Sequence, residues 1–102
     1  IVVLNNDGGG IFSYLPQAKI EAHYEELFGT PTALTFEQVA KMYDMEYVNV
    51  TTKEQFLATV TADKQQSLKL IEVFTNREEN VSEHRALWTR INEVIEQWLD
   101  ML

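Results

Sequence analysis

The sequence contains no cysteine and only two histidines, His23 and His84, among its 102 residues. Without cysteine the chain cannot form disulfide bonds, thiolate zinc sites or a cysteine nucleophile. Two histidines are also too few for a histidine-rich metal centre. Both are expected at the surface, and neither is assigned a catalytic role.

Basic residues are scarce as well, because 8 lysines and arginines stand against 16 aspartates and glutamates. The resulting net charge of −8, with the basic residues scattered along the chain, argues against nucleic acid or an anionic membrane as a partner. No apolar run approaches the length needed to span a bilayer, and the first residues lack the charge pattern of a signal peptide. A cytoplasmic location is therefore expected.

The composition is that of one soluble globular unit. Hydrophobic residues make up 45% of the chain and charged residues 24%, which is ordinary for a soluble domain. At 102 residues the chain is long enough for one hydrophobic core but not for two. It begins at Ile1, without an initiator methionine and within an apolar run, so we expect it to be the C-terminal piece of a longer protein.

The opening stretch carries the strongest local pattern. Residues 1–4 are an unbroken apolar run, which predicts a strand buried on both faces within a parallel sheet. Asn5 and Asn6 follow the run, and three consecutive glycines begin at Gly8. This order predicts a loop at the carboxyl end of the strand, where open α/β sheets bind ligands. The amide oxygen of Asn6 is a hard ligand suited to magnesium or calcium.

Helices and strands alternate through the rest of the chain. The first expected helices are a single turn at 11–15 and a short amphipathic helix within 17–30 that ends at Gly29. A third helix is expected to begin with a Thr35–Gln38 capping box, and a fourth is expected to be capped by Thr51-Thr52. The final helix is expected to begin at Asn80, with Glu83 completing a capping box. The expected strands are 47–50 and 68–74. Alternation of this kind indicates parallel pairing and predicts the α/β class, a three-layer αβα arrangement around a mostly parallel sheet.

The stretch Val3-Leu4-Asn5-Asn6-Asp7-Gly8-Gly9-Gly10-Ile11-Phe12 resembles the second half of the fingerprint of thiamine-diphosphate-dependent enzymes. In that family a Gly-Asp-Gly triplet precedes a strand that ends in Asn-Asn. Residues 36–43, the next strand and helix, and residues 68–74 are similar to the C-terminal half of the family's diphosphate-binding domain, and residues 6–16 are similar to its menaquinone-biosynthesis branch. The resemblance implies that residues 1–102 are the C-terminal portion of such a domain.

The resemblance also implies a half-site for a metal ion. It places the side-chain oxygen of Asn6 and the backbone carbonyl of Gly8 on the metal that anchors the cofactor's diphosphate. Asp7 receives no such role and is expected to be a solvated turn residue, while Asn5 is expected to brace the loop through hydrogen bonds. The aspartate of the Gly-Asp-Gly triplet, which would complete the protein ligands, is absent from this chain.

An apolar wall is implied next to that half-site. Ile11, Phe12 and Leu15 match positions that line the apolar side of the thiazolium and substrate pocket, and they are therefore expected to bind the cofactor. The glutamate that activates the cofactor in this family is also absent from the chain. No catalytic residue is assigned here, and the chain is expected to be inactive by itself.

The implied cofactors are thiamine diphosphate and Mg²⁺, with Mn²⁺ as a substitute. The implied reaction of the full enzyme is decarboxylation of 2-oxoglutarate and addition of the succinyl-semialdehyde unit to isochorismate, in a homodimer or homotetramer whose active sites form between subunits. One alternative is another 2-oxo acid decarboxylase or acetolactate-type synthase of the same family. A second alternative is a non-catalytic α/β interaction domain whose glycine loop is only a turn. A mononucleotide site is disfavoured, because the loop lacks the lysine and the Ser/Thr of a P-loop.

Overall fold

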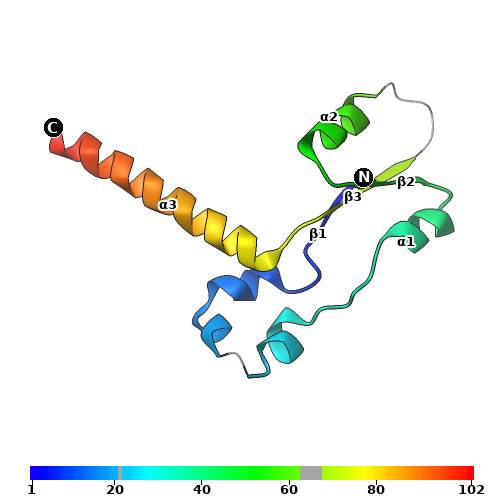
Figure 1. The fold of residues 1–102 in the computed structure, drawn as a ribbon, viewed down its shortest axis with the longest axis horizontal. Coiled ribbons are helices and arrows are strands. Elements are labelled where there is room, and N and C mark those ends of the chain that lie inside the picture. Colours follow the sequence, from blue (N-terminus) through cyan, green and yellow to red (C-terminus); the bar gives the residue numbers. More distant parts are fainter. Residues whose placement is uncertain (21, 63–67) are drawn as a thin grey trace.

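The computed structural model describes residues 1–20, 22–62 and 68–102, which form a three-stranded parallel sheet with helices around it (Figure 1). The strands are β1 (Val2–Asn5), β2 (Glu46–Val50) and β3 (Lys69–Phe74), arranged in the order β1-β3-β2. In the register of both pairings, Ile71 of β3 lies opposite Val2 of β1 and Val48 of β2. The predicted α/β class and parallel pairing are confirmed.

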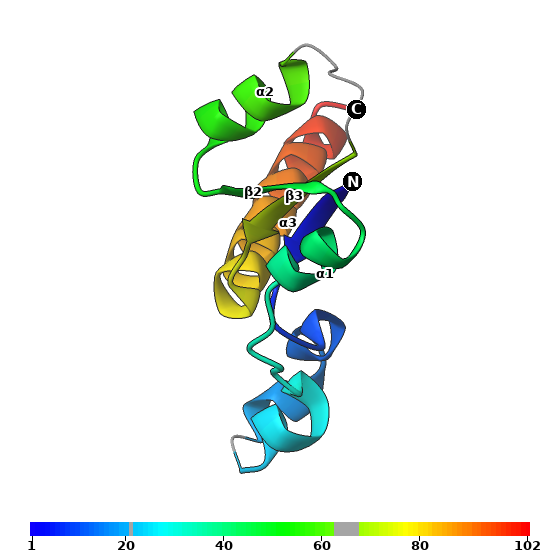
Figure 2. The ribbon, with the colours of Figure 1, turned by 90° about the vertical axis from the view of Figure 1, so that its right-hand side faces the viewer.

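Two short helices flank the strands. The path from β1 to β2 carries α1 (Glu37–Met42), and the return from β2 to β3 carries α2 (Lys53–Thr61). Because these two crossovers run in opposite directions across the sheet, right-handed connections put their helices on opposite faces. Figure 2 shows α2 above the strands and α1 below them.

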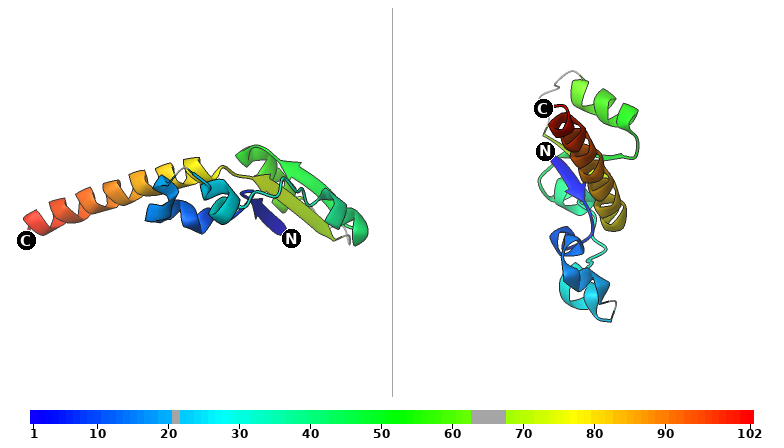
Figure 3. Two further views of the ribbon diagram at one scale, coloured as in Figure 1. Left: turned by 90° about the horizontal axis from the view of Figure 1, so that it is seen from below. Right: turned by 90° about the vertical axis from the view of Figure 1, so that its left-hand side faces the viewer.

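The final helix, α3 (Arg77–Asp100), leaves the carboxyl end of β3 and extends away from the sheet (Figure 3). Its first turns contact a 3₁₀ helix, η1 (Gly10–Tyr14), which is the helical turn predicted after the glycines. Large apolar side chains along α3 are exposed in the structure, at residues Leu87, Trp88, Ile91, Val94, Ile95, Trp98 and Leu102. The two tryptophans, Trp88 and Trp98, are 52% and 56% exposed. None of the described helices combines the length and the apolar content that crossing a membrane would need.

The core is small and centred on β3. Leu70 and Ile71 are buried there, together with Val50, Ala40 and Val81 from the neighbouring elements. The prediction that β1 is buried on both faces is wrong, because Val2 is 47% and Leu4 69% exposed. β1 lies at an edge of the three-stranded sheet, whereas the central position between two strands belongs to β3. The apolar run at residues 1–4 is unbroken, whereas Glu72 interrupts the run in β3, so an unbroken run did not identify the central strand.

Of three helix starts predicted from capping residues, the structure confirms one and differs from two. The cap at Thr52 is confirmed, since its hydroxyl accepts a hydrogen bond from the Gln55 amide at 3.2 Å. The final helix begins three residues before the predicted Asn80, because Asn76 caps it by accepting from the amides of Glu78 and Glu79 at 2.8 and 3.0 Å. This earlier cap also puts the two glutamates in the first turn, where the helix dipole favours negative charge.

The Thr35–Gln38 capping box is not formed. Helix α1 starts after Phe36, whose amide donates to the distant carboxylate of Glu72 at 3.1 Å instead of to a local side chain. The amphipathic helix predicted within 17–30 is replaced by a 3₁₀ helix, η2 (Pro16–Lys19), and a turn of π-helix, η3 (Glu25–Gly29). The predicted end at Gly29 is confirmed, and residue 21 lies outside the described residues.

Candidate functional site

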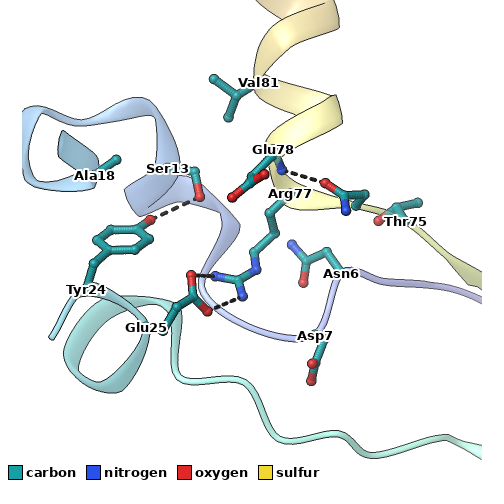
Figure 4. Close-up of a pocket in the computed structure, with 11 residues that line it drawn as sticks. Asn6, Asp7, Ser13, Ala18, Tyr24, Glu25, Thr75, Arg77, Glu78 and Val81 are labelled. Carbon is teal, nitrogen blue, oxygen red and sulfur yellow. Dashed lines mark hydrogen bonds and ion pairs between the residues drawn. The ribbon is translucent and has the colours of Figure 1, made fainter. Parts of the chain in front are cut away.

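The loop after β1 and the start of α3 meet at one edge of the sheet. Asn5 at the end of β1 lies opposite Phe74 at the end of β3, so the glycine loop and Arg77 emerge side by side. A pocket of about 770 Å³ opens there, lined by Asn6, Asp7, Tyr24 and Arg77 among others (Figure 4). This is the carboxyl edge of a parallel sheet, where such folds bind ligands.

Asn5 braces the loop, as expected from the sequence. Its Nδ2 donates to the carbonyl of Leu34 at 2.9 Å and to Oε1 of Glu72 at 2.7 Å. Its Oδ1 accepts from the amide of Asp7 at 3.0 Å. Both ends of the Asn5 amide are therefore engaged by protein groups, and this side chain is held in place on β1.

Asp7 differs from the solvated turn residue that was expected. Its backbone has φ 50°, and its Oδ1 accepts hydrogen bonds from the amides of Thr32 at 2.9 Å and Ala33 at 2.8 Å. The hydrogen bond from Ala33, and then that from Thr32, lower the pKa of Asp7. In Figure 4 its carboxylate points away from Asn6. Asp7 thus ties the loop to residues 32–33, a contact across 25 residues that the local sequence does not signal.

The glycines are required by close contact between two stretches of backbone. Gly8 has φ +139°, a conformation that side-chain-bearing residues rarely adopt, and a Cβ there would overlap the carbonyl oxygen of Gly29. The next amide, of Gly9, donates to that same carbonyl at 2.8 Å. The excursion through η3 is therefore fastened directly onto the loop.

Asn6 is left as the unengaged polar side chain of the loop. It lines the pocket and makes no hydrogen bond to any other described residue (Figure 4). Gly10 keeps the space that the amide occupies, because a Cβ on Gly10 would lie 2.5 Å from Nδ2 of Asn6. The carbonyl of Gly8, the other predicted ligand, is in the same loop and accepts a hydrogen bond from the Gly10 amide at 3.0 Å.

The oxygen atoms of this loop suit a hard cation as part of its coordination shell. An amide oxygen and a peptide carbonyl are neutral hard donors, and Mg²⁺ takes few ligands from protein while phosphate and water fill the rest. In residues 1–20, 22–62 and 68–102, no group of three or more His, Cys, Asp or Glu side chains is placed to hold a metal ion. The donor chemistry of the Asn6 amide oxygen and the Gly8 carbonyl fits such an ion.

Arg77 is the cation of the pocket, and it is paired. Its guanidinium binds the carboxylate of Glu25 at 2.6 and 3.3 Å, with the Arg77 side chain only 13% exposed (Figure 4). The hydrogen bond to Glu25 raises the pKa of Arg77. Neither residue was singled out from the sequence, because 52 positions separate them and no motif connects them.

The predicted apolar wall lies on η1 and just beyond it. Phe12 packs edge-on against Phe28 with ring centroids 5.6 Å apart, and it is 36% exposed. Ile11 and Leu15 are 72% and 41% exposed, and neither lines the pocket around Asn6. The structure therefore gathers Asn6 and Gly8 in one loop and presents Ile11, Phe12 and Leu15 as apolar surface beside it.

Comparison with known proteins identifies relatives along most of the chain. No family model matches it. It is 59% identical over 92 residues to the 2-succinyl-5-enolpyruvyl-6-hydroxy-3-cyclohexene-1-carboxylate synthase of Lysinibacillus sphaericus, which covers 90% of this chain and 16% of the relative. Proteins of the same name from Oceanobacillus iheyensis and Bacillus cytotoxicus are 54% and 50% identical over 96 and 91 residues, covering 93% and 88% of this chain. The chain spans 16–17% of the length of these relatives.

Proposed function

We propose that this chain, a homologue of those synthases over about 90% of its length, is the C-terminal portion of the diphosphate-binding domain of such an enzyme. The proposed enzyme decarboxylates 2-oxoglutarate and adds the succinyl-semialdehyde unit to isochorismate in menaquinone biosynthesis. Identities of 50–59% to synthases of one name favour this reading over another 2-oxo acid decarboxylase and over a non-catalytic interaction domain.

The observation that carries the proposal is the unengaged amide of Asn6. On either side, Asn5 is hydrogen-bonded through both ends of its amide and Asp7 through Oδ1, whereas Asn6 faces the pocket without a hydrogen bond to any described residue. A polar side chain left free at the carboxyl edge of a parallel sheet is placed to bind a ligand. We assign the Asn6 side-chain oxygen and the Gly8 carbonyl to a divalent cation, Mg²⁺ or Mn²⁺.

The cation would in turn hold thiamine diphosphate, which when bound supplies the electron sink for decarboxylation of a 2-oxo acid. This chain contributes binding and orientation. Asn6 and Gly8 would hold the metal that binds the diphosphate, and the exposed side chains of Ile11, Phe12 and Leu15 would provide an apolar wall that excludes water. Other parts of the site would come from outside these residues, namely the remaining protein ligand of the metal and the glutamate that activates the cofactor. The proposed enzyme is cytoplasmic and homo-oligomeric, so a second subunit would complete the site.

Replacing Asn6 with alanine in the holoenzyme tests this assignment. Loss of a ligand oxygen should weaken Mg²⁺-dependent binding of thiamine diphosphate by roughly 10- to 100-fold or more, since even outer-shell changes at metal sites cost that much. Titration calorimetry with the cofactor at fixed Mg²⁺, and direct titration with Mn²⁺, would measure the affinity. Asn92→Ala, at an exposed position of α3, is the matched control. An affinity for Asn6→Ala equal to that of the control would remove Asn6 from the site.

A further inference from the structure

Glu72, in the central strand β3, is the one buried charged side chain among the residues that the structure describes, with 0% exposure. Burying a carboxylate is costly unless its oxygen atoms are hydrogen-bonded. No cation among the described residues pairs with it, and its hydrogen-bond donors come from elements that are far apart in the sequence. A buried carboxylate held in this way points to a role other than packing in the sheet.

Each oxygen of the carboxylate serves a different part of the fold. Oε2 accepts from the hydroxyl of Tyr47 on β2 at 2.6 Å and from the amide of Phe36 before α1 at 3.1 Å. Oε1 accepts from Nδ2 of Asn5 at 2.7 Å. Three neutral donors hold the carboxylate, and their hydrogen bonds together outweigh the effect of burial, so the pKa of Glu72 lies below its ordinary value.

The bond to Asn5 fixes which way that amide faces. An ionised carboxylate can only accept hydrogen bonds, so the NH₂ group of Asn5 must face Glu72 and its oxygen must face the loop. That oxygen then accepts from the amide of Asp7 at 3.0 Å. The two residues that flank Asn6 in the chain are therefore linked to each other and, through Asn5, to Glu72.

We propose that Glu72 is a positioning residue for the cation site: by orienting the Asn5 amide, it holds the loop so that the Asn6 side chain faces the pocket. This inference rests on the proposed role of Asn6 as a ligand. A glutamine at position 72 would not serve, since it offers a single acceptor oxygen and its NH₂ group would confront at least one of the three incoming donors.

The test compares two variants that break the link with one that spares it, all in the holoenzyme. Glu72→Gln and Asn5→Ala remove the fixed orientation, whereas Tyr47→Phe removes a donor from Oε2 and leaves the bond between Oε1 and Asn5. Affinity for Mn²⁺ and for thiamine diphosphate at fixed Mg²⁺ is measured, together with the unfolding midpoint in urea.

We expect Glu72→Gln and Asn5→Ala each to weaken metal-dependent cofactor binding by about tenfold or more, the range seen when residues that orient metal ligands are changed. The double variant should lose no more than the worse single variant, because both act through one link. Tyr47→Phe should lower the unfolding midpoint yet keep its affinity within about twofold of the unmodified enzyme.

Additive losses in the double variant, or an unchanged affinity in Glu72→Gln, would overturn the inference. If Glu72→Gln does not fold, the affinity of Asn5→Ala for the cofactor tests the inference by itself. An unchanged affinity in Asn5→Ala would then overturn the inference. Failure of the proposed function is distinguishable, because then Asn6→Ala also binds like the unmodified enzyme. When Asn6→Ala is impaired and both link variants are not, the inference alone fails.

Discussion

Gly10→Ala separates the binding role of the loop from its structural role. A Cβ at this position would lie 2.5 Å from Nδ2 of Asn6, and ordinary van der Waals contact begins at 3.4 Å, so the amide must retreat by about 0.9 Å. Ligand oxygens sit about 2.0–2.1 Å from Mg²⁺ in a nearly ideal octahedron, which does not tolerate a displacement of this size. We expect cofactor affinity at fixed Mg²⁺ to fall by roughly 10- to 100-fold.

The stability of Gly10→Ala should not fall together with its cofactor affinity. The backbone of Gly10 lies outside the left-handed region, and the group in the way is the end of a side chain, which can move. Replacing a glycine by alanine at such a position changes stability by no more than about 1 kcal/mol and can increase it, because the unfolded chain loses freedom. Urea unfolding would measure this, and calorimetric titration of thiamine diphosphate would measure the affinity.

The decisive control is the same substitution in a chain that already carries Asn6→Ala. Without the amide there is nothing for the new methyl group to displace, so Gly10→Ala should then change affinity by less than about twofold. The reasoning is refuted if Gly10→Ala alone binds cofactor like the unmodified enzyme. An equal loss in the presence and absence of the Asn6 amide would refute it too.

Two further predictions concern groups away from Asn6. A double-mutant cycle of Arg77→Ala and Glu25→Ala should give a coupling free energy of about 1 kcal/mol that falls with added salt, because the pair is bidentate and Arg77 is 13% exposed. The exposed pair of Lys41 and Glu37 is the control and should have a smaller coupling free energy. Equal coupling free energies for the two pairs would contradict the prediction. Burial, and then the hydrogen bond to Glu72, raises the pKa of Tyr47 to about 12 from 10.0, so its contribution to stability is complete below pH 10 and is lost as the pH rises through 12. Ultraviolet absorbance of ionised tyrosine should show this step, and its presence in Tyr47→Phe would disprove the assignment.

Local patterns predicted the elements, and distant contacts decided their details. The strands at 47–50 and 68–74 and the cap at Thr52 follow from residue types in one short stretch, and the structure confirms them within a residue or two. The capping box at Thr35 did not form, because the helix starts one residue later, after Phe36, whose amide donates to Glu72 far along the chain. No pattern within a helix-length window reveals such a distant partner.

In the candidate site, too, some features could be predicted from neighbouring residues and others depend on distant contacts. Asn5, Asn6 and the glycines stand next to one another, so the loop could be located from the sequence. The partners that give each residue its task, such as Glu25 for Arg77, lie tens of positions away and are brought close by the parallel crossovers. Sequence reasoning located the loop but could not say which of its side chains the fold had already engaged.

The strand order has a consequence for how the chain assembles. Val2 pairs with Ile71 across 69 positions, whereas Val48 pairs with the same residue across 23, so closing the β1 loop costs about 1 kcal/mol more entropy. On the ribosome, at ~5–20 residues per second, β1 waits on the order of 3–15 s for β3 to be made. During that time β1 lacks β3, the strand with which it pairs among the described residues. Of these three strands, the one that leads into Asn6 is made first and waits longest for β3.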